Sequence, residues 1–176
     1  MTKDKIVAVF GSSRVKPDSD TYNQALETGR LLAEAGFKVC NGGYAGIMEA
    51  SAKGAKQANG KTIGVTTNAF KELKISEWID EEVHSQDYME RLQKLVQIAD
   101  AFIILRGGIG TLSEFSIVWC LNVIGEMKKP MILVGDSWKK TVDNMSKNLI
   151  ISPREMHALT IVKEPKSAVE ILKRIF

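Results

Sequence analysis

Two glycine-rich segments of this 176-residue chain have the composition of a phosphate-binding turn. The first is Asn41-Gly42-Gly43-Tyr44-Ala45-Gly46, and the second is Arg106-Gly107-Gly108-Ile109-Gly110-Thr111. Each follows an apolar run and leads directly into a segment with helical periodicity. Glycine lets backbone N–H groups approach a ligand without side-chain obstruction, and a helix N-terminus adds unpaired donors and a positive dipole end. The two turns therefore predict an anion site that suits a phosphate group.

A third apolar run ends at Gly11-Ser12-Ser13, which offers further small residues beside the two turns. Ser12 either binds ribose or phosphate, or simply terminates the strand. Neither of two common nucleotide motifs is present: no Gly-x-Gly-x-x-Gly follows the first strand, and Gly60-Lys61-Thr62 leads into a strand rather than a helix. The nucleotide or phosphate contacts predicted from the three segments are Gly11, Ser12, Gly42, Gly43, Gly46, Met48, Gly107, Gly108, Gly110 and Thr111.

Glu114 and Arg91 are the charged residues near these turns that could take part in a reaction. Glu114 follows Thr111 by three positions, a spacing that is also typical of a capping box, which satisfies helix N-terminal amides without any chemistry. Arg91 has its own structural alternative, a surface ion pair with Glu90 or Asp87. The residue types alone leave both alternatives open. Met48 and Met89 fit a core or a cavity wall better than a reactive role.

The sequence gives little support to a metal site or a catalytic triad. His84 and His157 lie far apart without a third ligand pattern, so no metal site is expected. No nucleophile elbow supports a Ser-His-Asp triad. Cys40 and Cys120 both lie in apolar segments and are expected to be small buried hydrophobic residues rather than a disulfide.

Short apolar runs alternate with amphipathic stretches along the whole chain. Strands are predicted at 6–10, 37–40, 62–65, near 82–84, 101–105, 130–134 and 158–162, and helices at 20–35, 46–58, 87–99, 110–125, 138–149 and 167–175. This alternation predicts an α/β fold with a doubly wound, Rossmann-like parallel sheet of six or seven strands and helices on both faces. One domain spanning 1–176 accommodates it. Ligands of such sheets bind beyond the carboxyl ends of the strands, where all three glycine-containing turns fall. Segment 66–80 is either a lid or an irregular connection.

Composition sets the broad class of the protein. Apolar residues make up 44% and charged residues 26%, and the formal net charge is +3, with Lys and Arg spread among Asp and Glu. We therefore expect neither a nucleic-acid partner nor a membrane. Residues 1–5 contain no apolar signal segment, which together with the two unpaired cysteines predicts a cytoplasmic location. The segment 115–124 is apolar nearly all round, which indicates either deep burial or a subunit interface in a homo-oligomer.

Several ordered segments together resemble one known family. Gly107-Gly108-Ile109-Gly110-Thr111-Leu112-Ser113-Glu114 resembles the PGGxGTxxE signature of the Lonely guy family, nucleoside 5′-monophosphate phosphoribohydrolases that have also carried the label "possible lysine decarboxylase". The segment from Gly42 to Met48 is similar to the family's GGGxxGLM turn, and Val9 to Ser13 to its first strand and turn. Arg91 stands where the family has MxxRK, nine residues before Asp100.

The resemblance implies that Arg91 and Glu114 are a catalytic pair, with a nucleoside monophosphate such as AMP as ligand or substrate and no required cofactor. Breaking the N-glycosidic bond passes through an oxocarbenium-like state that a carboxylate stabilises, by analogy with glycoside hydrolysis. Family members are commonly dimers, so a dimer or larger homo-oligomer is expected. The decarboxylase label would need pyridoxal phosphate on a lysine in a recognisable site, and the sequence offers none.

This chain departs from the family pattern at three positions: Arg106 replaces the signature proline, Leu92 replaces the lysine after Arg91, and Tyr88 replaces the methionine. The superfamily also includes molybdenum-cofactor carriers and nucleotide-sensing proteins. The sequence therefore supports two functions. The first is hydrolysis of a nucleoside monophosphate to free base and ribose 5-phosphate, which the intact Arg91 and Glu114 favour. The second is non-catalytic carriage or sensing of a nucleotide-like cofactor, which the departures favour.

Overall fold

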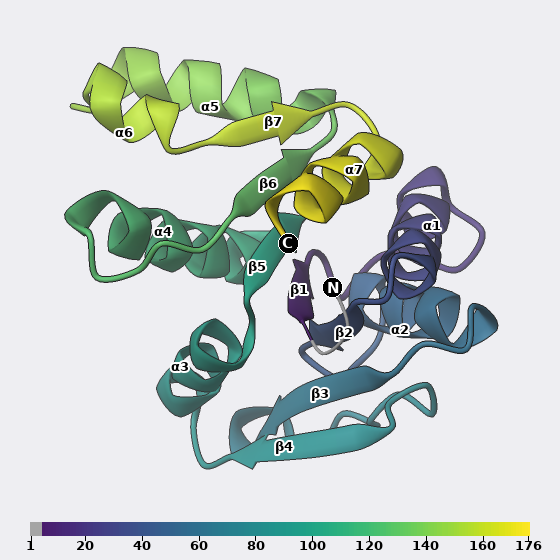
Figure 1. Cartoon of the computed structure of the whole chain (residues 1–176). Coiled ribbons are helices and arrows are strands. Elements are labelled where there is room, and N and C mark those ends of the chain that lie inside the picture. Colours follow the sequence, from purple (N-terminus) through teal and green to yellow (C-terminus); the bar gives the residue numbers. More distant parts are fainter. Residues whose placement is uncertain (1–4) are drawn as a thin grey trace.

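The computed structural model describes residues 5–176 and is built on one parallel sheet of seven strands (Figure 1). Residues 1–4 lie outside this range, and with them most of the N-terminal segment in which no apolar signal sequence was expected. Strand order is β4-β3-β2-β1-β5-β6-β7. The strands are β1 (Ile6–Phe10), β2 (Lys38–Asn41), β3 (Thr62–Thr67), β4 (Glu81–Ser85), β5 (Ala101–Ile104), β6 (Met131–Val134) and β7 (Thr160–Val162). The predicted doubly wound sheet is thus confirmed, with seven strands.

Helices cover both faces of the sheet, as the alternating sequence predicts. They are α1 (Asp20–Glu34), α2 (Ile47–Gln57), η1 (Asn68–Phe70), α3 (Tyr88–Ile98), α4 (Ile109–Ile124), α5 (Asp136–Asn148), α6 (Pro153–His157) and α7 (Pro165–Ile175). Figure 1 shows α1, α2 and α7 on one side of the sheet and α3, α4 and α5 on the other.

The sheet is buried because successive residues of its central strands point into two separate apolar cores. On β1, Val7 and Val9 pack with α1, α2 and α7, whereas Ala8 and Phe10 pack with α3, α4 and α5. All of these side chains are at most 2% exposed. Burial on both faces explains why the strands are continuously apolar rather than alternating.

The chain reverses its direction of travel across the sheet between β1 and β5. From β1 it proceeds outward to β4, and it then returns to β5 on the other side of β1, in register from Val7–Ala101 to Phe10–Ile104. This reversal separates the loops that follow β1 and β5 and opens a crevice between them, the usual ligand position in doubly wound sheets. The Gly11 and Gly107 turns both lie at this point.

The structure corrects several sequence expectations near the C-terminus. The strand predicted at 158–162 is shorter, and residues 153–157 form α6, which begins with a capping box formed by Ser152 and Glu155 and with Pro153 in its first turn. The sequence Ser-Pro-x-Glu carried this signal. Helix α5 begins at Asp136, two residues earlier than expected.

Cys120, expected to be buried, is exposed on α4, whereas Cys40 is buried as predicted.

No helix within residues 5–176 is long and apolar enough to cross a lipid bilayer. Within the same range, no three or more His, Cys, Asp and Glu side chains gather in a way that would hold a metal ion. The expectation that the protein needs no metal stays a prediction.

Candidate active site

A cavity of about 590 Å³ opens at the carboxyl ends of β1 and β5 and brings together residues from across the sequence. Nine of the predicted site residues line it: Gly11, Ser12, Met48, Arg91, Gly107, Gly108, Gly110, Thr111 and Glu114. Gly42, Gly43 and Gly46 do not line it. The two glycine-rich turns, which look alike in sequence, therefore have different positions relative to the cavity.

The turn before α4 presents free backbone amides to the cavity. Gly108 is the N-cap, no side chain of residues 5–176 caps the helix, and the first helical hydrogen bond runs from Leu112 N to Gly108 O at 2.9 Å. The amides of Ile109, Gly110 and Thr111 precede it and have no acceptor in the described chain. A Cβ on Gly108 or Gly110 would have no heavy atom within 4 Å. This turn thus combines open space with helix N-terminal donors, which is what a phosphate group needs.

The capping-box alternative for Glu114 is wrong. Because α4 begins at Ile109, Thr111 is its third residue rather than the N-cap, and Glu114 lies in the second turn. The Glu114 carboxylate has no hydrogen-bond donor among residues 5–176 and faces the cavity from a side chain that is 11% exposed. A buried acid that caps nothing is available for chemistry.

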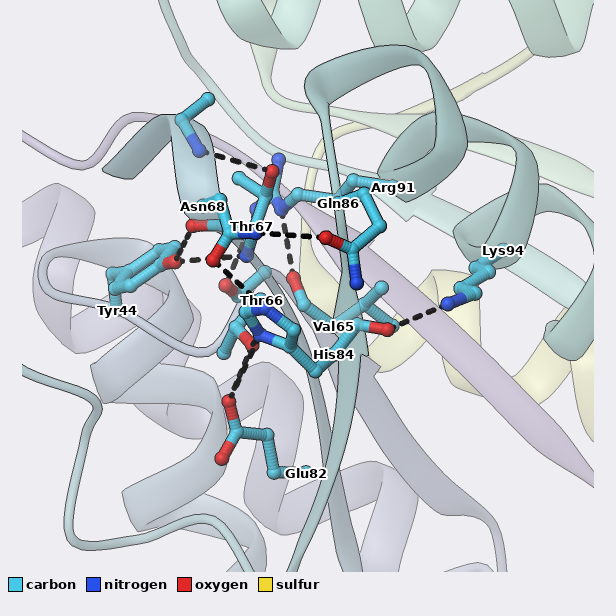
Figure 2. Close-up of polar contacts among 12 residues, drawn as sticks. Tyr44, Val65, Thr66, Thr67, Asn68, Glu82, His84, Gln86, Arg91 and Lys94 are labelled. Atoms are coloured by element: carbon cyan, nitrogen blue, oxygen red, sulfur yellow. Dashed lines mark hydrogen bonds and ion pairs between the residues drawn. The ribbon is translucent and has the colours of Figure 1, made fainter. Parts of the chain in front are cut away.

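The surface ion-pair alternative for Arg91 is wrong as well. Arg91 is 4% exposed, and its Nε donates to Val65 O at 2.7 Å while its Nη2 donates to Gly42 O at 3.2 Å. The Met48 sulfur lies 3.9 Å from Nη2. Figure 2 shows the guanidinium reaching from α3 toward the end of β3. Two carbonyls therefore fix the orientation of this side chain before any ligand arrives.

Among residues 5–176, Arg91 and Glu114 form the one ion pair between residues that line the cavity. Arg91 Nη1 lies 3.9 Å from Glu114 Oε1, beyond hydrogen-bond distance. Burial raises the pKa of Glu114 to about 7, and the positive charge of Arg91 opposes this rise without cancelling it. Glu114 thus changes its charge near neutral pH, which suits proton transfer or charge stabilisation at a reacting centre.

The glycines of the first turn pack against the protein itself and do not line the cavity. A Cβ on Gly42 would overlap the Arg91 Nη2 atom and the Met48 sulfur. Gly46 has φ +71°, and a Cβ there would overlap the backbone of Ser12 and Ser13. The Ile47 amide donates to Ser12 O at 3.0 Å, which fastens the start of α2 to the loop after β1. The glycines of this turn are required by close packing.

Three aromatic residues, Tyr44, Phe70 and Tyr88, form an aromatic wall of the cavity, a role that the sequence did not suggest for them. Phe70 packs edge-on against Tyr44 and against Tyr88, with ring centroids 5.9 and 6.2 Å apart. The Arg91 guanidinium carbon lies 5.9 Å from the Tyr44 ring centre and 5.8 Å from that of Phe70. All three aromatic residues line the cavity, where they offer a surface on which a nucleobase could stack. The available signal was the presence of Phe70 among the scattered apolar residues of the polar segment 66–80.

A polar network fixes the segment that carries Phe70 (Figure 2). The Tyr44 hydroxyl donates to Thr67 O at 3.2 Å and accepts from Thr67 N at 3.1 Å. Asn68 Nδ2 donates to Gln86 Oε1 at 3.0 Å, and its Oδ1 lies 3.0 Å from His84 Nε2. Of segment 66–80, expected to be a lid or a connection, the first two residues belong to β3, and Phe70 and Leu73 line the cavity next to this network.

The three departures from the family pattern have different positions. Leu92 is 3% exposed, packs on the α4 side of α3 and does not line the cavity. Tyr88 lines it, and its hydroxyl donates to Ser113 Oγ at 3.3 Å. Arg106 lines it with an exposed side chain just before the α4 turn. Replacement of the lysine therefore removes no contact in this cavity, whereas Arg106 adds a positive charge to its rim.

Comparison with known proteins agrees with this geometry. The family model described as SLOG cluster4 matches residues 4–169. A cytokinin riboside 5′-monophosphate phosphoribohydrolase of Mycobacterium tuberculosis is 30% identical over 96% of this chain and 93% of its own length. An uncharacterised protein of Archaeoglobus fulgidus is 34% identical over 73% of this chain and 83% of its own. A molybdenum cofactor binding protein of Rippkaea orientalis has a similar structure, with a TM-score of 0.79, 25% identity and 99% of both chains covered.

The seven-stranded Rossmann-like sheet, with its cavity at the carboxyl ends of β1 and β5, thus places the protein in a class of α/β proteins shared by phosphoribohydrolases and cofactor carriers. Within that class, the chain belongs to the Lonely guy family, in its SLOG cluster4 group.

Replacing Gly42 and Gly110 by alanine separates the roles of the two turns. Gly42→Ala forces the new methyl group into Arg91, so we expect a loss of about 1–3 kcal/mol in unfolding free energy. Gly110→Ala meets nothing within 4 Å and should leave stability unchanged within about 0.5 kcal/mol. Urea denaturation measures both. Equal losses in the two variants would contradict the assignment of Gly42 to packing.

Glu114→Gln should change the pH dependence of stability. The folded pKa of about 7 lies above the ordinary value of 4.5 for a glutamate, so the folded state holds the proton more tightly, and ionisation of Glu114 destabilises it as pH rises from 4.5 through 7. This penalty is on the order of 3 kcal/mol above pH 7 and is absent in the Gln variant. We expect the variant to gain stability relative to the parent between pH 5 and pH 8, as measured by denaturation at each pH. A pH-independent difference would show that Glu114 titrates normally.

Proposed function

We propose that the protein is a nucleoside 5′-monophosphate phosphoribohydrolase, which splits its substrate into free base and ribose 5-phosphate. The observation that carries this proposal is the position of Glu114, a buried carboxylate with a near-neutral pKa, one turn along the helix whose N-terminus offers free amides to the same cavity. The printed function of the Mycobacterium tuberculosis relative, at 30% identity, supports the same reaction.

In the proposed reaction, the 5′-phosphate binds the amides of the α4 turn, and the base lies toward the aromatic wall of Tyr44, Phe70 and Tyr88. The bond between C1′ and the base nitrogen breaks, and its electron pair leaves with the base. The ionised Glu114 stabilises the positive charge that develops on the ribose. Water then forms the new bond to C1′, and one of its protons goes to the leaving base. No cofactor takes part in these steps.

Arg91 acts in this mechanism as a positioning residue. Its Nε and Nη2 are already committed to Val65 O and Gly42 O, so phosphate binding does not depend on them. Its charge keeps Glu114 from becoming more basic still, because it favours the carboxylate. Arg91 thus favours the ionised form of Glu114 without occupying its oxygens.

A non-catalytic carrier of a nucleotide-like cofactor is the alternative function. The observation in its favour is the structural similarity to the molybdenum cofactor binding protein of Rippkaea orientalis at 25% identity. A carrier would bind its ligand in the same cavity without cleaving it. Assay of base release therefore separates the two functions.

We also propose that the protein forms a homo-oligomer through α3 and α4. A groove of about 500 Å³ runs between these helices, lined by apolar residues that include Met89, Leu92, Ile117 and Leu121. Met89, expected to lie in the core or a cavity wall, is 67% exposed at this groove, and Ile124 is 60% exposed on α4. A second copy would cover these side chains. Light scattering that gives a monomer mass would contradict this.

The first test is release of free base from AMP and a panel of other nucleoside monophosphates, followed by chromatography. We expect release by the parent protein and a loss of at least about 100-fold in Glu114→Gln, because the variant lacks the stabilising carboxylate. Glu164→Gln is the matched control, since Glu164 is exposed and does not line the cavity. Nucleotide binding without base release would contradict the hydrolase function and support the carrier function.

The pH profile of kcat/KM tests the ionisation state of Glu114. The pKa of about 7 means that the carboxylate form predominates above pH 7. If the carboxylate stabilises the transition state, kcat/KM rises with pH to a plateau, with a midpoint near 7. Residual activity of Glu114→Gln should lack this midpoint. A fall in activity across the same range would mean that the protonated acid is the working form.

A further inference from the structure

A polar network on β3 and β4 surrounds His84, a residue that the proposed reaction does not use (Figure 2). His84 Nδ1 lies 3.0 Å from Thr66 Oγ1, and His84 Nε2 lies 3.0 Å from Asn68 Oδ1. The Thr66 hydroxyl donates to a carboxylate oxygen of Glu82, and Asn68 Nδ2 donates to Gln86 Oε1 at 3.0 Å. Both ring nitrogens of His84 therefore have a side-chain oxygen within hydrogen-bond distance.

The hydrogens of this network require a charged His84. A hydroxyl group has one hydrogen to donate, and Thr66 gives it to Glu82, whose carboxylate can only accept. The contact between Thr66 and His84 therefore needs a hydrogen on Nδ1. The amide oxygen of Asn68 can only accept, so the second contact needs a hydrogen on Nε2. A ring with hydrogens on both nitrogens is an imidazolium, and only this form completes the network.

The charged groups around His84 compensate an imidazolium. Glu82 Oε1 lies 3.7 Å from His84 Nδ1, and Glu90 of α3 is within electrostatic reach of the ring. Lys94 Nζ donates to the backbone oxygen of His84 at 2.5 Å and pairs with Glu90 at 2.8 Å. Among residues 5–176, β3 and η1 contribute only uncharged side chains to these contacts. Two carboxylates and one ammonium group thus surround the half-exposed ring.

The contact between His84 and Asn68 connects this network to the cavity. Asn68 is the first residue of η1 and Phe70 is the last, and Phe70 belongs to the aromatic wall. Because Glu82 lies beside Nδ1, that nitrogen keeps its hydrogen, and Nε2 is the one that loses it. A bare Nε2 then faces Asn68 Oδ1 with no hydrogen between them, which weakens the contact. The charge of His84 therefore controls one of the bonds that hold η1.

We propose that His84 is a positioning residue for the nucleobase: its charged form holds Asn68, and its neutral form releases η1 and weakens the stacking of a base on Phe70. The inference rests on the proposed function only in the binding of a base against the aromatic wall. Histidine is the side chain that most readily changes its charge at physiological pH. Ligand binding thus responds to pH through a residue that does not itself line the cavity.

NMR of the ligand-free protein tests the link between His84 and Phe70. The chain has two histidines, His84 and His157, and Glu114, with its pKa of about 7, also titrates near neutral pH. The variant His157→Gln/Glu114→Gln removes both other groups. We expect the Phe70 ring and the Asn68 side-chain amide to shift with pH along the same curve as the His84 ring. Phe70 signals that stay unchanged would overturn the inference, because an Asn68 amide turned by 180° would then satisfy a neutral ring.

Titration calorimetry with AMP at pH 6 and pH 8 tests the effect on a ligand. Glu114→Gln is the starting protein, because it removes the ionisation of Glu114 and suppresses the proposed turnover. We expect its affinity for AMP to fall about threefold more between these pH values than that of Glu114→Gln/His84→Gln, as the loss of one net hydrogen bond provides. Ionisation of the AMP phosphate is common to both proteins and cancels. His157→Gln in the same background is the matched control and should preserve the threefold difference, since His157 is exposed on α6 outside the cavity.

Equal pH dependence of AMP affinity with and without His84 would overturn the inference, as would the absence of measurable AMP binding. Neither measurement needs turnover, so both are independent of the proposed hydrolase. A protein in which His84 controls Phe70 and AMP affinity, but which releases no base, retains this positioning residue and loses the hydrolase function. Base release by the parent protein with an AMP affinity that does not depend on His84 has the opposite meaning.

Discussion

The buried guanidinium of Arg91 connects the parts of the molecule that form the cavity. It extends from α3, donates to carbonyls at the end of β3 and in the turn after β2, and faces a carboxylate on α4. Its flat face also lies near the rings of Tyr44 and Phe70. A buried charge is tolerated when hydrogen bonds and an opposite charge compensate it, and losing one partner of such a pair costs about 3–5 kcal/mol. Arg91 thus links β3, the glycine turn and the aromatic wall to α4.

Glu114 shows how stability and reactivity oppose each other at this site. Arg91 stands close enough to lower the energy of the carboxylate but too far away to hydrogen-bond it. Burial therefore dominates, and the pKa rises to about 7. A shorter contact would stabilise the folded protein at neutral pH, but it would also occupy the oxygens that the proposed reaction uses. The geometry favours an acid that remains responsive to a ligand.

The glycines of the two turns have different roles: those of the first are packed against other parts of the protein, and those of the second leave space for a ligand. Gly42 and Gly46 are glycines because the protein itself occupies the space beside them, through Arg91 in one case and the Ser12–Ser13 backbone in the other. Gly108 and Gly110 have open space beside them and lie at a helix N-terminus. One turn therefore builds the wall of the cavity and the other faces its interior. Similar composition in the two segments reflects two different physical requirements.

The sequence by itself determined the doubly wound sheet, because its strands are continuously apolar and its helices have a regular apolar face. It also indicated nine of the nineteen described residues that line the cavity, since strands of a parallel sheet end at one edge and bring their loops together. Helix α6 was not predicted, although Ser152 and Glu155 have the spacing of a capping box.

Only the tertiary structure decided which alternatives hold for Arg91 and Glu114, since burial and pairing arise between α3 and α4, far apart in sequence. The same is true of Phe70, whose position depends on hydrogen bonds that Tyr44 makes across 23 residues. Local pattern specifies which element a residue occupies, whereas its partners depend on how distant elements pack. That is why a capping box and a buried ion pair were indistinguishable in the sequence, and why they differ clearly in the fold.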